Sequence, residues 1–115
     1  MRPYVATIFF FFGLMPVDLG ADTWISLNNK ALFNALADKT LAYEDAIQRF
    51  YSDGNTLYDA GQESWGKWRV EGDKYCSLWP PTDQWDCYFF EMNSRGDGVR
   101  FVAKDGSATI GRYVK

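Results

Sequence analysis

Two cysteines are the side chains of this sequence with the most evident chemistry. Cys76 and Cys87 lie within the segment YCSLWPPTDQWDC, which also holds two tryptophans and a Pro-Pro pair. Their spacing is not the Cys-x-x-Cys of thiol oxidoreductases, whose tight arrangement lowers the pKa of the attacking thiol. We instead predict a structural disulfide across a hairpin. Closing a loop of this length stabilises a small domain by about 3 kcal/mol in the chain-entropy model.

The sequence offers little else for catalysis or metal binding. It contains no histidine, the commonest general base and metal ligand. A structural zinc site takes four cysteine or histidine ligands, and only two cysteines are present. Asp83, Asp86 and Glu63 are carboxylates that could serve a glycoside hydrolase, although such residues are typically solvated turn groups. We therefore expect no catalytic residue, no metal and no cofactor, with glycan hydrolysis as the weakest alternative.

Aromatic side chains dominate both faces of the hairpin that the cysteines flank. Strand alternation places Leu78, Trp85 and Phe89 on the face of the cysteines. The opposite face receives Tyr75, Ser77, Trp79, Asp86, Tyr88 and Phe90. The second face either packs in a core beneath a helix or is offered to a partner, because Tyr and Trp give large contact area at low entropy cost. The candidate ligand-binding residues are Tyr75, Trp79, Trp85, Tyr88 and Arg69.

The elements that position these residues follow from hydrophobic periodicity. Apolar residues at helical spacing predict one amphipathic helix over 26–39, with Ser26 as its cap. Aromatic and β-branched runs between glycine turns then predict eight short strands. We place these near 40–43, 46–51, 56–60, 65–71, 74–79, 85–92, 99–103 and 108–114. Because every connection is too short for a parallel crossover, the fold class is mainly β: an antiparallel meander that forms a small barrel or a strongly curved sheet.

The N-terminal segment predicts export. Arg2 precedes an apolar run over 5–15, and small residues follow at 20–21, so residues 1–21 read as a signal peptide and 22–115 as a single domain. We expect a periplasmic or extracellular protein with no membrane span after cleavage. The net charge is −3 and no basic block is present, which argues against nucleic acid as a partner. The sequence leaves the oligomeric state open.

The motif layout resembles that of small secreted bacterial β-domains. The shared features are a helix, a Thr-Leu-x-Tyr strand from Thr40, a Gly-x-Trp strand at Gly66 and Trp68, and two cysteines flanking tryptophans. The resemblance implies a β fold and an envelope setting, and no particular activity. We expect a non-enzymatic module that recognises a protein or a glycan through the aromatic 75–90 hairpin.

The main alternative is a small-molecule carrier with an apolar cavity inside the barrel. Its expected lining is Trp68, Val70, Leu78 and Phe101.

Overall fold

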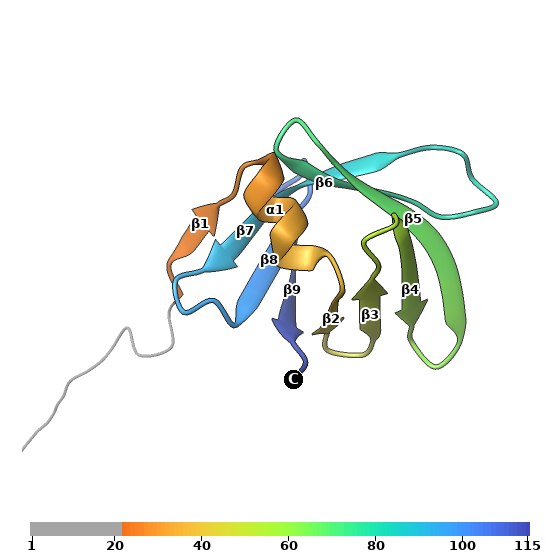
Figure 1. The fold of residues 1–115 in the computed structure, drawn as a ribbon, viewed down its shortest axis with the longest axis horizontal. Helices are drawn as coiled ribbons and strands as arrows, with labels where there is room; N and C mark the ends of the chain where they lie inside the picture. Colours follow the sequence, from red (N-terminus) through yellow and green to blue (C-terminus); the bar gives the residue numbers. More distant parts are fainter. Residues whose placement is uncertain (1–21) are drawn as a thin grey trace, which may run out of the picture.

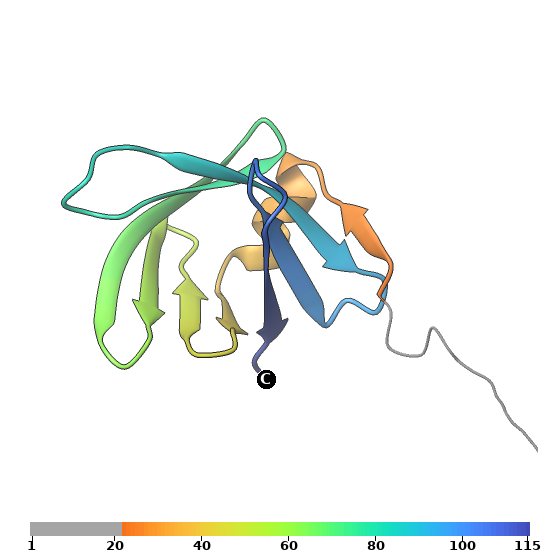
Figure 2. The same ribbon diagram turned by 180° about the vertical axis from the view of Figure 1, so that it is seen from behind.

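The computed structural model describes residues 22–115, in which a meandering sheet closes on itself (Figure 1). The expected signal peptide at 1–21 lies outside the described residues. Consecutive strands pair antiparallel in the order β2 (Lys39–Ala42), β3 (Ile47–Phe50), β4 (Asn55–Asp59), β5 (Glu63–Glu71), β6 (Lys74–Leu78), β7 (Asp86–Asn93), β8 (Gly98–Val102) and β9 (Ala108–Tyr113). β2 also pairs with β9, with Leu41 opposite Tyr113, and this pairing completes an eight-stranded barrel. Figure 2 shows β2 and β9 side by side. The predicted fold class is confirmed, and the sheet is a closed barrel.

The expected disulfide is confirmed, and it joins neighbouring strands in register. Cys76 of β6 and Cys87 of β7 are directly opposite, with Cα atoms 4.0 Å apart. The turn before β6 also follows the prediction. Gly72 and Asp73 have φ angles of 60° and 59°, as a two-residue hairpin turn requires.

One additional strand was not predicted. β1 (Trp24–Ser26) pairs with the C-terminal half of β7, with Ile25 opposite Met92. The N-terminal half of β7 pairs with β6, so β1 continues the edge of the sheet where β6 ends. Ser26 therefore lies in a strand, and its predicted role as helix cap is wrong.

The helix α1 (Asn29–Leu36) is shorter than predicted and begins after Asn28. The Asn28 side chain accepts a hydrogen bond from the backbone N–H of Ala31 at 2.9 Å, so Asn28 is the cap. The helix ends before Asp38, whose φ of 62° is left-handed. Asn29 and Asp73 fix the helix start to the β5–β6 turn, because each side chain accepts a hydrogen bond from the other residue's backbone N–H.

The helix closes one end of the barrel. It contacts β2, β5 and β6, and β2 and β6 lie on opposite sides of the eight-stranded ring. A helix that contacts both must cross the opening, as Figure 1 shows. Its apolar face of Leu32, Ala35 and Leu36 is buried. Within residues 22–115, no helix has the length and apolar character that crossing a membrane requires.

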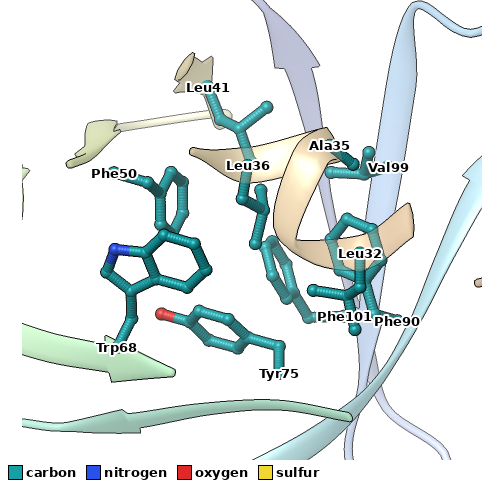
Figure 3. Close-up of a cluster of buried hydrophobic side chains, with 10 residues drawn as sticks. All are labelled: Leu32, Ala35, Leu36, Leu41, Phe50, Trp68, Tyr75, Phe90, Val99 and Phe101. Carbon is teal, nitrogen blue, oxygen red and sulfur yellow. The ribbon is translucent and has the colours of Figure 1, made fainter. Parts of the chain in front are cut away.

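The hydrophobic core lies between the helix and the barrel wall (Figure 3). Its buried members are Leu32, Ala35, Leu36, Leu41, Phe50, Trp68, Tyr75, Phe90, Val99 and Phe101. Truncating a fully buried leucine such as Leu32 or Leu36 to alanine typically costs about 2–5 kcal/mol. Tyr75 and Phe101 pack with ring centroids 4.8 Å apart and form the boundary of this core on the side away from the helix.

Candidate functional site

A pocket of about 540 Å³ opens beyond Tyr75 and Phe101, at the barrel end that the helix does not cover. Residues from all around the barrel line it: Tyr43, Gln48, Tyr58, Ser64, Trp65, Tyr75, Ser77, Trp79, Pro80, Tyr88, Phe101 and Thr109. No residue of α1 is among them, so the pocket and the helix occupy opposite ends of the barrel. Its volume falls within the roughly 300–1,000 Å³ typical of small-molecule sites.

The pocket floor is a network of satisfied polar groups. The Tyr43 hydroxyl donates to Gln48 Oε1 at 2.7 Å, and Gln48 Nε2 donates to Thr56 Oγ1 at 2.9 Å and to the Tyr75 hydroxyl at 3.4 Å. Thr56 in turn donates to the Arg49 carbonyl. Gln48 is only 5% exposed, so this network fixes its side-chain amide.

Burial keeps the two floor tyrosines neutral. It raises the pKa of Tyr75 to about 12, which hydrogen bonds from Ser77 and Gln48 only partly offset. Burial, with additional repulsion from Tyr75 and Tyr58, also raises the pKa of Tyr43 above its usual value. Both groups therefore remain phenols at physiological pH and can donate hydrogen bonds.

Two glycines make room for two of the aromatic side chains that line the pocket. A Cβ at Gly66 would lie 2.5 Å from Cε3 of Trp79, and a Cβ at Gly111 would lie 2.9 Å from Cε1 of Tyr43. The Trp79 ring therefore lies directly against β5 at Gly66. Its position is further held by a 3.2 Å hydrogen bond to Ser77 Oγ and an edge-on contact with Tyr58.

Several hydroxyl groups around the pocket are not engaged. Within residues 22–115, the hydroxyls of Tyr58, Tyr88, Ser64 and Thr109 make no hydrogen bond to another group of the protein. The lining also carries no charged side chain among the described residues. The pocket thus presents aromatic surfaces and neutral hydrogen-bonding groups, an environment suited to an uncharged polar ligand.

The five predicted site residues separate into two groups. Tyr75, Trp79 and Tyr88 line the pocket. Arg69 and Trp85 lie on the outer face instead, with the guanidinium carbon 4.0 Å from the Trp85 ring centroid. Since Tyr75 and Ser77 face the interior, strand alternation places Cys76, and with it the disulfide, on that outer face.

The carrier alternative predicted an apolar cavity inside the barrel, and most of the lining residues that it named lie elsewhere. Of the four expected lining residues, Phe101 borders the pocket. Trp68 is 3% exposed in the core beneath the helix, and Val70 packs against that core. Leu78 pairs with the exposed Lys67 and points away from the interior. Packed side chains fill the space inside the barrel near the helix, and the open space lies at the far end.

The carboxylates considered for glycan hydrolysis lie elsewhere. Asp83 and Glu63 are exposed and border no part of the pocket, while Asp86 borders a separate depression on the outer surface. In the part of the chain that the structure describes, no cluster of three or more acidic, cysteine or histidine side chains could hold a metal ion.

The pocket also includes residues that the sequence reasoning did not select. Trp65 comes from β5, the strand next to the cysteine hairpin, whereas Tyr43, Gln48 and Tyr58 come from the β2–β4 region and meet the hairpin because the sheet closes. Alternation within each strand signals which residues face inward, but it does not show which end of the barrel stays open.

No family model matches the chain, and no curated protein or solved structure matches it either.

Proposed function

We propose that this chain is a non-enzymatic, exported binding module that holds a neutral glycan in the open end of its barrel. The observation that carries the proposal is the composition of the pocket. Aromatic rings alternate there with hydroxyl groups that lack protein partners, and no charged side chain of residues 22–115 is present.

A sugar ring matches this composition chemically. Its C–H faces are apolar and pack against aromatic surfaces such as Trp79, while its edge carries hydroxyls that both donate and accept hydrogen bonds. Tyr58, Tyr88 and Ser64 offer such partners from three strands. Pairing the ligand's polar groups matters, because a buried hydroxyl without a partner costs about 1–3 kcal/mol.

A small apolar ligand is the second candidate, and the interior position of the pocket favours it. A carrier for such a molecule leaves the unengaged hydroxyls without a role, since an apolar ligand would remove them from water without replacing their hydrogen bonds. For this reason the glycan is preferred.

Export is part of the proposal. The Cys76–Cys87 disulfide supports it, because such bonds persist in oxidising compartments and are rare in the cytosol. The apolar N-terminal pattern of the sequence supports it independently.

The test compares two tryptophans of one hairpin. Binding of neutral glucose, xylose and N-acetylglucosamine oligomers is measured by calorimetry for the wild type, Trp79→Ala and Trp85→Ala. We expect Trp79→Ala to weaken binding at least about tenfold, because it removes a pocket wall. Trp85→Ala is the matched control, since Trp85 lies on the outer face, and it should change affinity less than about twofold.

Three results would contradict the proposal. The first is wild-type protein that binds none of the oligomers. The second is equal loss in the two variants, which would place the contact outside the pocket. The third is wild-type protein that binds an apolar dye more tightly than every sugar and loses dye binding in Trp79→Ala. That result would favour the carrier.

A further inference from the structure

The pocket is continuous with an exposed aromatic surface on the outside of the barrel. Trp65 borders the pocket, yet it alternates with the inward Ser64 and Gly66 and is 56% exposed. Its ring stacks on Tyr51, with centroids 5.9 Å apart and planes 27° from parallel. We call Trp65, Tyr51 and Arg49 the outer ledge.

Two contacts of Arg49 hold the outer ledge in place. The Arg49 guanidinium carbon lies 5.2 Å from the Tyr51 ring centroid, and Arg49 Nη1 donates a 3.0 Å hydrogen bond to Thr40 Oγ1. Trp65 therefore rests on a ring that is itself supported. A large exposed tryptophan fixed in this way loses little conformational entropy when a ligand packs against it.

From this continuity we infer that the ligand is the end of a glycan chain longer than one ring. The terminal ring occupies the pocket against Trp79, and the next ring leaves over the rim and stacks on Trp65. The inference rests on the proposed function and specifies its ligand as an oligosaccharide bound by its end. A single-ring ligand would leave the outer ledge unused.

Only the open end of the pocket allows this path. Tyr75 and Phe101 form the floor, and the helix closes the barrel beyond them, so a chain cannot thread through. The ligand must enter and leave at the same opening. Binding should therefore require a free chain end and fail for chains blocked at both ends.

The experiment measures affinity against chain length. Single-ring, two-ring and four-ring members of the oligomer series that the wild type binds are titrated into wild type, Trp65→Ala and Phe89→Ala. Phe89 is the matched control, because it is an outer-face aromatic of similar exposure, 51%, and does not border the pocket. Both substitutions affect exposed side chains, so they should leave folding intact, which circular dichroism checks.

We expect wild-type affinity to rise from one ring to two and then to level off. Trp65→Ala should weaken two-ring and four-ring binding about three- to tenfold more than single-ring binding, because Trp65 borders the pocket but offers most of its exposed ring to the second ring of the ligand. Phe89→Ala should change neither. A four-ring chain capped by bulky groups at both ends should lose binding to the wild type.

Opposite outcomes overturn the inference in distinguishable ways. Equal wild-type affinity for one and two rings, or equal loss at every length in Trp65→Ala, would show a single-ring site while leaving the proposed function standing. Undiminished binding of the doubly capped chain would show that the chain does not enter by its end. Wild-type protein that binds no oligomer at any length would overturn the proposed function together with the inference.

Discussion

Replacing Gly66 with alanine should displace the pocket wall, because the position has no space for a side chain. A Cβ there would lie 2.5 Å and 2.7 Å from Cε3 and Cζ3 of Trp79 and 2.8 Å from the carbonyl oxygen of Leu78. Contacts under 3.0 Å are not sustained, so the Trp79 ring must move. The substitution thus tests whether Trp79 lies against β5 as the structure describes.

The cost follows from the contacts that Trp79 would give up. Its edge-on packing against Tyr58 contributes about 0.5–1.5 kcal/mol. Its hydrogen bond to Ser77 contributes a further 0.5–1.5 kcal/mol, approximately. Alanine also restricts the unfolded chain more than glycine does, which offsets about 0.4–1 kcal/mol of this loss of stability. We therefore expect Gly66→Ala to lower the free energy of unfolding by about 1–2 kcal/mol.

The assay is urea unfolding followed by circular dichroism, performed as a double-mutant cycle. Gly66→Ala is measured in the wild type and in Trp79→Ala. The cost should fall by at least half in the second background, where only the Leu78 carbonyl still crowds the new methyl group. Ser64→Ala is the control: it changes the neighbouring inward position and should alter stability by less than about 0.5 kcal/mol.

Two results would refute the reasoning. If Gly66→Ala is as stable as the wild type, the ring does not occupy the space above β5. If the cost is the same with and without Trp79, the strain lies in the backbone, and Trp79 is not the neighbour that position 66 accommodates.

Three further perturbations test the disulfide, the buried tyrosine and the pocket floor. Replacing Cys76 and Cys87 together with alanine should lower the free energy of unfolding by about 3 kcal/mol through the released loop entropy, as urea unfolding would measure; an unchanged midpoint would contradict this. Because burial raises the pKa of Tyr75 to about 12 from its unfolded value of about 10, its stabilising contribution is full below pH 10 and is lost as pH rises toward 12. The fall in stability across that window should be shallower in Tyr75→Phe by about 2–3 kcal/mol, and identical slopes would contradict the assignment. Gln48→Leu leaves the Tyr43 hydroxyl without its partner and should cost about 1–3 kcal/mol in thermal unfolding, whereas full stability would show that water replaces the amide.

Local sequence signals were enough to predict the barrel strands. Glycine turns such as Gly72-Asp73 separate runs of strand-forming residues. Both ends of each of the eight predicted strands lie within two residues of the ends of an observed strand. Because the connections are short, sequence order also determined the neighbours of each strand. The cysteine pairing followed from the same hairpin geometry.

Long-range pairing explains the errors near the N-terminus. Ser26 and Asn28 are both favourable helix caps, and propensity alone does not choose between them. Pairing with Glu91, more than sixty residues away in the sequence, holds Ser26 in β1, so Asn28 caps the helix. A three-residue strand carries too little pattern for its partner to be predicted.

The position of the pocket was not predictable for a different reason. Both faces of the cysteine hairpin are aromatic, so composition did not reveal which face was interior. Tyr88 and Trp85 are three residues apart, yet one borders the pocket and the other stacks on Arg69 outside. Strand alternation separates the two faces, and closure of the sheet through the β2–β9 pairing determines which of them is interior.

The size of the inward side chains determines which end of the barrel contains the pocket. Toward the helix, the inward positions carry large side chains such as Phe50, Trp68 and Phe90, which fill the interior with the aid of α1. Toward the open end, β5 and β6 carry the small inward residues Gly66 and Ser77 between the larger aromatic side chains that line the pocket. A barrel of eight strands is just wide enough for side chains to fill it, so small residues at one end leave a cavity there. The closed end thus supplies the hydrophobic core that stabilises the fold, and the open end retains the pocket.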